Sequence, residues 1–233
     1  QAMHVPVQVS AEYRSRYAGR FDRGWDVMRA ERAERVRQLG LVRDDVQLAE
    51  PPDDARRWDD LSGDQQARYA AMMEVYAGML EAMDHELGRL MDHLEAKGLA
   101  DDTIVVVVSD NGPEYNELPA DHDPLGGHGP LLERLGEKGT TASIGPEWAT
   151  VASAPLSLFK FNASEGGARV PMILAGPGVP NTEPVQARAH IMDLAPTVLD
   201  LVDVPIVDAP EGAPQIRGRS LVKIYFIVDE AQN

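Results

Sequence analysis

"TIVVVVSDNGPE", residues 103–114, joins a run of strand-forming residues directly to a polar loop. The four valines at 105–108 do not alternate with polar residues. Such a run favours a strand that is buried on both faces, as in a parallel sheet flanked by helices. The run is followed by Asp110 and Asn111, and then by a Gly-Pro step that favours a sharp turn. Because ligands of α/β sheets bind beyond the carboxyl ends of strands, this pair of side chains is a candidate site.

The composition indicates a globular protein and excludes several classes of partner. The chain has 233 residues, 43% of them apolar, and a formal net charge of −16. So acidic a chain is a poor candidate for nonspecific binding to nucleic acid. The absence of cysteine excludes disulfides and thiolate zinc sites in the chain. No apolar run approaches the ~20 residues of a membrane-spanning helix. We therefore expect neither a nucleic-acid nor a membrane partner.

The spacing of apolar residues predicts helices at 25–39, 63–97 and 190–202, and strands at 103–108, 170–175 and 221–228. Ser62 and Gln65 form a capping-box pattern at the start of the longest helix, and Gly98 ends it. Alternation of helices and strands predicts an α/β protein. We expect the strands 103–108 and 170–175 to lie mostly buried in one sheet, with the two later helices packed on it.

Two regions are expected to lack long regular elements. Residues 1–24 read as loop with short helical turns. Residues 112–150 read as a long Gly/Pro-rich connection, and connections of that length are usually functional or mobile. The connection contains His122 and His128. A zinc site there is an open alternative, but the spacing of these histidines matches no standard motif.

Three short clusters supply groups with useful chemistry, and each has a plainer explanation when it is taken alone. Asp110 and Asn111 offer the oxygen ligands that Ca²⁺ and Mg²⁺ prefer, or they form a polar turn. "LFKFNASEGGARVP", residues 158–171, offers Lys160 as a point charge for an anionic oxygen, or simply a surface lysine before a glycine turn. "MHVP", residues 3–6, offers His4, although a lone histidine before such a step usually has no special role.

Taken together, the clusters are more specific. "VVSDNG", "KFNASEGGARVP" and "HIMDLAPTVLDL" occur in this order and resemble the sulfatase family of the alkaline-phosphatase-like superfamily. "MHVP" resembles the family's His-x-Pro element, and residues 144–160 resemble the segment that leads to the active-site lysine of bacterial arylsulfatases. The resemblance implies a three-layer α/β/α sandwich of alkaline-phosphatase-like type, here an incomplete portion. Residues 1–220 would be the C-terminal part of a catalytic domain, and residues 221–233 a tail of uncertain structure.

The resemblance also implies an activity and roles for the candidate residues. Sulfatases hydrolyse sulfate esters with a formylglycine, made from the Cys or Ser of a C/S-x-P-S-R motif, and with a divalent cation. By this resemblance Asp110 and Asn111 are metal ligands for Ca²⁺ or Mg²⁺. Lys160 contacts the sulfate and the leaving oxygen, and His4 hydrogen-bonds the sulfate or assists the leaving group. The expected partner is a small-molecule sulfate ester, whose charged transition state needs a cation and preorganised donors.

The chain also departs from the family pattern. It contains no cysteine and no x-P-S-R motif, so the formylglycine is not present, and the family's N-terminal acidic metal ligands are missing. We expect the N-terminal part of the same protein to be needed for activity, and the chain alone to be inactive. Two alternatives stay open: a phosphate or phosphonate monoester hydrolase of the same superfamily, and a noncatalytic acidic binding module.

Overall fold

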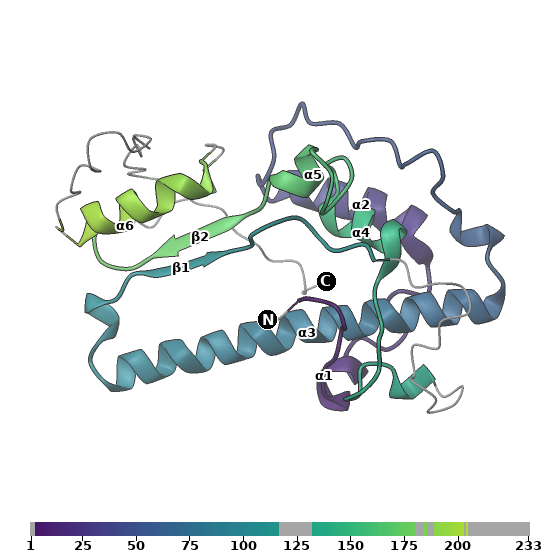
Figure 1. The fold of residues 1–233 in the computed structure, drawn as a ribbon, viewed down its shortest axis with the longest axis horizontal. Helices are drawn as coiled ribbons and strands as arrows, with labels where there is room; N and C mark the ends of the chain where they lie inside the picture. The colour runs from purple at the N-terminus through teal and green to yellow at the C-terminus, as the bar shows by residue number, and fades with distance from the viewer. Residues whose placement is uncertain (1–2, 117–131, 180–183, 186–188, 203, 205–233) are drawn as a thin grey trace, which may run out of the picture.

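The structure is a computed structural model, and it describes residues 3–116, 132–179, 184–185, 189–202 and 204. Within these residues, the structure is mostly helical, and its one small sheet of two strands lies to one side of most of the helices (Figure 1). The elements follow in the order α1 (Ala11–Ser15), α2 (Gly24–Gln38), α3 (Gly63–Ala96), β1 (Val105–Val108), α4 (Gly145–Ser153), α5 (Glu165–Ala168), β2 (Met172–Ala175) and α6 (Leu194–Leu201).

The helices predicted from apolar spacing are confirmed, with one shortened. The long helix is α3, and its capping box is present. The Ser62 side chain accepts from the Gln65 N–H at 3.3 Å, and the Gln65 side chain accepts from the Ser62 N–H at 2.9 Å. Gly98 has a positive φ of 66°, which suits the end of a helix. The last helix is α6, which begins only at Leu194 because residues 191–193 form a 3₁₀ turn.

An aromatic cluster forms the centre of the core. Trp25 contacts Trp58 and Trp148 edge-to-face, with ring centroids 4.7 and 5.7 Å apart. Trp148 is fully buried on α4, which packs against α2. The prediction that residues 112–150 form a loop throughout is therefore wrong, since α4 begins at Gly145. The glycines and prolines around α4 favoured a loop in the sequence, but tertiary packing stabilises a helix there.

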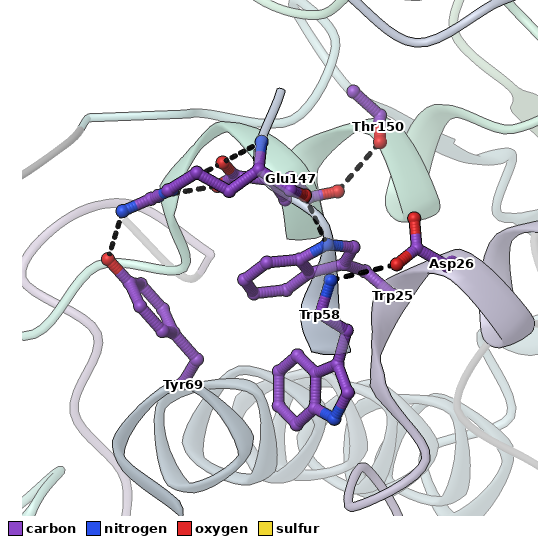
Figure 2. A network of polar contacts seen from close by, with 7 residues as sticks. Trp25, Asp26, Trp58, Tyr69, Glu147 and Thr150 are labelled. Carbon is purple, nitrogen blue, oxygen red and sulfur yellow. Dashed lines mark hydrogen bonds and ion pairs between the residues drawn. The ribbon is translucent and has the colours of Figure 1, made fainter. Parts of the chain in front are cut away.

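A buried ion pair lies beside this aromatic cluster. Glu147 of α4 is only 4% exposed, and its two carboxylate oxygens accept from Arg56 Nε and Nη2 at 2.6 Å each. Arg56 also donates to the Tyr69 hydroxyl at 2.7 Å, and its carbonyl accepts from Trp25 Nε1 at 2.8 Å. Figure 2 shows Glu147, Trp25 and Tyr69 converging on this network. The network joins α2, α3 and α4 around a charge that would otherwise be buried without a partner.

The two predicted strands do pair in one sheet, but not as expected. β1 and β2 run antiparallel, with Val105 opposite Ala175 and Val108 opposite Met172. The expectation of a parallel, mostly buried sheet is wrong for the described residues: most of β1 is half-buried, and Val108 is 36% exposed. The reason is that the described sheet has only two strands, so its edges and much of its faces lack neighbours. Asp110 does lie just beyond the carboxyl end of β1.

Several expectations fall on residues that are not described. The predicted strand at 221–228, the tail 221–233, and the loop histidines His122 and His128 all lie outside the described residues. Among the described helices, none combines the length and the hydropathy that a membrane-spanning segment requires.

We expect Glu147→Ala to lower the free energy of unfolding by about 3–5 kcal/mol, because it leaves Arg56 without its buried partner. The matched control is Glu31→Ala. Glu31 also pairs with an arginine through both carboxylate oxygens, at 2.7 Å each, but on the exposed surface. Its loss should cost less than about 1 kcal/mol. Urea unfolding followed by tryptophan fluorescence measures both variants, and equal losses would contradict the assignment.

Candidate active site

A cleft of about 1040 Å³ opens between α3, the loop after β1 and the segment before β2. His4, Asp110, Asn111 and Lys160, the four residues singled out in the sequence, all line it. They come from three segments that are far apart in the chain. The structure therefore brings the candidate residues to one cavity, while their roles stay predictions.

The cleft also explains a departure from the expected packing. Helix α3 was predicted to pack on the sheet. Instead the cleft lies between its apolar residues Met83 and Leu87 and the sheet residues Val107 and Ile173. In Figure 1 the second half of α3 runs along the sheet on the side opposite α6. The apolar stripe of α3 is thus only partly used for contacts within the described chain.

His4 and Lys160 meet at a third residue, Glu114. Lys160 Nζ lies 3.4 Å from His4 Nε2 and 3.5 Å from Glu114 Oε2. His4 Nε2 lies 3.2 Å from the same carboxylate oxygen. The other ring nitrogen of His4, Nδ1, lies 2.8 Å from the Val5 carbonyl. Because a carbonyl only accepts, Nδ1 carries a proton, and Nε2 is the nitrogen turned toward Lys160 and Glu114.

The segment that carries His4 is fixed by backbone pairing. Val7 N–H donates to the Ala142 carbonyl at 3.0 Å, and Val9 N–H donates to the Gly136 carbonyl at 2.9 Å. The Val7 side chain is buried in a cluster with residues of α3. These contacts give His4 a defined place beside Lys160 although it lies near the start of the chain.

Asp110 and Asn111 follow β1 on an exposed loop at the cleft. Asn111 Nδ2 donates to the Gly112 carbonyl at 3.1 Å, and Ser109 Oγ donates to the Asn111 carbonyl at 2.7 Å. A carboxylate and a carboxamide fit Ca²⁺ or Mg²⁺ in the kind of ligand. They do not suffice in number, because Ca²⁺ takes six to eight oxygens. Within the described residues, no group of three or more His, Cys, Asp or Glu side chains is arranged to hold a metal ion.

The electrostatics of the cleft differ from those of the whole chain. The net charge of the chain is −16, yet basic residues slightly outnumber acidic ones along the cleft. The five basic lining residues are Arg16, Arg20, Arg32, Lys160 and Arg169, and the four acidic ones are Glu81, Asp84, Asp110 and Glu114. Burial lowers the pKa of Arg32 to about 10, so its guanidinium remains charged at neutral pH. Burial raises the pKa of Tyr76, so its phenol is neutral there. This balance allows an anion to bind locally in an acidic protein.

Glycines dock the two loops of the site against each other. Gly112 N–H donates to the Gly167 carbonyl at 2.9 Å, and Lys160 N–H donates to the Pro113 carbonyl at 3.1 Å. A Cβ at Gly112 would lie 1.9 Å from the Gly166 carbonyl oxygen, and one at Gly166 would lie 2.1 Å from the Leu158 carbonyl oxygen. Only glycine permits this approach. The loop of Asp110 and the loop of Lys160 are therefore joined through their backbones.

Sequence reasoning missed three residues of the cleft. Glu114 gave one weak signal, a carboxylate placed directly after the Asp-Asn-Gly-Pro turn. Arg32 gave none, because it lies on α2 among charges that read as a solvated helix face. Tyr76 gave none either, because its spacing places it on the apolar face of α3, which indicates a core residue.

We expect Gly112→Ala to lower the free energy of unfolding by about 1–3 kcal/mol, because the new methyl group overlaps the Gly166 carbonyl and forces the loops apart. The matched control is Gly88→Ala on α3, where a Cβ meets no atom within 4 Å. Alanine favours helix, so this variant should be as stable as the parent or up to about 1 kcal/mol more stable. Urea unfolding compares the two, and a Gly112→Ala protein as stable as the parent would refute the docking.

Comparison with known proteins agrees with the sequence resemblance. The family model described as Sulfatase matches residues 1–204. An uncharacterised sulfatase of Schizosaccharomyces pombe is 36% identical over 212 residues, which cover 88% of this chain and 38% of that protein. An arylsulfatase of Klebsiella aerogenes is 29% identical, over 87% of this chain and 45% of that protein. The human steryl-sulfatase is 28% identical, over 63% of this chain and 22% of that protein.

The chain thus spans less than half the length of these relatives. The family match nevertheless extends over most of the chain and includes all four candidate residues. The chain belongs to the sulfatase family, and with it to the α/β proteins of alkaline-phosphatase-like type.

Proposed function

We propose that the protein hydrolyses sulfate esters, and that His4, Asp110, Asn111 and Lys160 form part of its active site. The observation that carries this proposal is their placement along one cleft, with Lys160 Nζ and His4 Nε2 only 3.4 Å apart although 156 positions separate them. Family membership supports the same reaction. The small antiparallel sheet would then be one portion of a larger three-layer sandwich.

The residues of this chain supply charge neutralisation and proton handling. The Lys160 ammonium binds a sulfate oxygen and stabilises the negative charge that develops on the leaving oxygen. His4 Nε2 shares the same space, and in its protonated form it donates a hydrogen bond to the sulfate or the leaving oxygen. Asp110 and Asn111 contribute two ligands to a Ca²⁺ or Mg²⁺ ion, which would polarise the sulfate when bound.

The remaining parts of the machinery would come from elsewhere in the same protein. This chain has no cysteine, and the formylglycine nucleophile would belong to the portion of the sulfatase domain that the chain does not span. Additional acidic ligands from that portion would complete the cation site.

We expect Lys160→Ala and Asp110→Ala in the full-length protein each to lower kcat/KM for 4-nitrophenyl sulfate by about 100-fold or more, because each removes a charge that stabilises the transition state. Lys97→Ala is the control for loss of a lysine, since Lys97 lies exposed at the end of α3. Full activity of the Lys160→Ala enzyme would refute its role. Faster turnover of 4-nitrophenyl phosphate than of the sulfate would favour a phosphate monoester hydrolase.

An exposed aromatic ring beside Lys160 supports an aromatic leaving group. Phe161 is 72% exposed, and its ring centroid lies 5.1 Å from Lys160 Nζ. The Tyr115 ring meets Phe161 edge-to-face at 6.0 Å. Phe161 also has a positive φ of 69°, which is unfavourable for a bulky residue, and such strained positions cluster at functional sites. A substrate bound at Lys160 would place an aryl group within reach of this exposed ring.

We expect Phe161→Ala to reduce the preference for 4-nitrophenyl sulfate over an alkyl sulfate such as hexyl sulfate by about 2- to 10-fold. This range corresponds to the binding free energy of one aromatic contact. Phe161→Tyr keeps the ring and should keep the preference. The measured quantity is the ratio of the two kcat/KM values. An unchanged ratio in Phe161→Ala would show that the ring does not contact the leaving group.

A further inference from the structure

We propose that Glu114 is a positioning residue of this active site: its buried carboxylate holds the side chains of Lys160 and His4 in the orientation in which both face the substrate. The inference rests on the proposed sulfatase function and adds a residue that neither the sequence motifs nor the family resemblance singled out.

The geometry places Glu114 behind the two candidate catalytic side chains. Its Oε2 atom lies 3.2 Å from His4 Nε2 and 3.5 Å from Lys160 Nζ, so one oxygen contacts both. Its Oε1 atom accepts a hydrogen bond from Asn116 Nδ2. Glu114 is 8% exposed, whereas the His4 side chain is 54% exposed. A substrate entering the cleft therefore meets His4 well before it meets the carboxylate.

This arrangement suits orientation better than substrate binding. A carboxylate repels a sulfate ester, so Glu114 gains nothing as a direct contact. Lys160, by contrast, has a flexible four-carbon side chain that loses up to about 2 kcal/mol of rotamer entropy when it is fixed. An ammonium has three donors, and the pair with Glu114 leaves others for the substrate. Glu114 fixes the lysine before the substrate arrives, which is the preorganisation that charged transition states require.

His4 is restrained in the same way from two sides. Its Nδ1 faces the Val5 carbonyl at 2.8 Å, and its Nε2 faces Glu114 and Lys160. With the ring protonated, Nε2 donates to the carboxylate, and with the ring neutral, Nε2 accepts from the lysine. In either form the ring keeps Nε2 at the position of the reacting group.

The backbone of the loop has hydrogen bonds of its own that do not involve the Glu114 side chain. The backbone at Lys160 is fixed by its own hydrogen bond to Pro113, and the neighbouring loops are docked through Gly112 and Gly167. The Glu114 side chain is therefore free to act on the orientation of side chains. Its replacement should change chemistry more than it changes the position of the loop.

The test uses the full-length protein with Glu114→Ala and Glu114→Gln, assayed for 4-nitrophenyl sulfate turnover. We expect Glu114→Ala to lower kcat by about 10- to 100-fold, because misplaced catalytic groups cost this much. KM should stay the same or fall, since a negative charge near the anionic substrate is removed. Glu114→Gln retains an oxygen that accepts hydrogen bonds from Lys160 and His4. Its kcat should therefore be at least about tenfold higher than that of Glu114→Ala. Glu31→Ala, which removes an exposed glutamate of α2 that pairs with Arg23 away from the cleft, should leave kcat unchanged.

The possible outcomes separate the two claims. An active wild type with an unchanged Glu114→Ala variant would overturn the role of Glu114 alone. A loss of activity that Glu114→Gln does not restore, with a matching fall of the unfolding midpoint, would also overturn it, because that pattern indicates a structural ion pair. A wild type that is inactive toward sulfate esters would overturn the proposed function itself.

Discussion

The backbone contact between Gly112 and the glycines Gly166 and Gly167 of the short helix α5 is the constraint on which the arrangement of the site depends. It brings the loop that follows β1 against the segment that precedes β2 at a distance that no side chain would permit. Asp110 and Asn111 lie just before Gly112, and Lys160 lies in the loop that leads to α5. Their separation across the cleft is therefore set by main-chain geometry, which moves less than a pair of side chains.

The core explains why the contact can be held in place. Helix α4 is buried among the tryptophans of the neighbouring elements, and its Glu147 is tied to Arg56. The chain leaves α4 and reaches Lys160 within seven residues of Ser153. A rigid helix thus anchors one wall of the cleft, while the backbone pairing of Val7 anchors the segment that carries His4. The candidate groups Lys160 and His4 are thus connected to segments that are packed into the core.

Local signals predicted the parts of the fold that local forces determine. The capping box of α3 and its apolar period lie within one stretch of chain, and both are present in the structure. The antiparallel pairing of β1 and β2 could not be predicted from the sequence. It depends on the path of the long connection between the two strands, which contains α4. Helix α4 was missed because its stability comes from tertiary burial of Trp148 rather than from its composition.

The residues of the candidate site likewise fall into those that short motifs predict and those whose role depends on the tertiary structure. The chemical character of Asp110, Asn111 and Lys160 could be read from short motifs, and His4 joined them only through resemblance to a family. Glu114 could not be predicted as a partner of His4 and Lys160, because a carboxylate near a turn gains that role only when two distant loops dock. The basic contribution of Arg32 was equally hidden, since its burial follows from packing of α2 against α4.

The central claim is that one cleft binds both a cation and a sulfate group, and a crystal structure of the full-length protein with Ca²⁺ and sulfate tests it most directly. The account predicts sulfate oxygens about 2.7–2.9 Å from Lys160 Nζ, with His4 Nε2 in hydrogen-bond contact with the same anion. It also predicts Ca²⁺ about 2.3–2.6 Å from oxygens of Asp110 and Asn111. A sulfate and a cation bound away from these residues, with Lys160 turned out of the cleft, would contradict it.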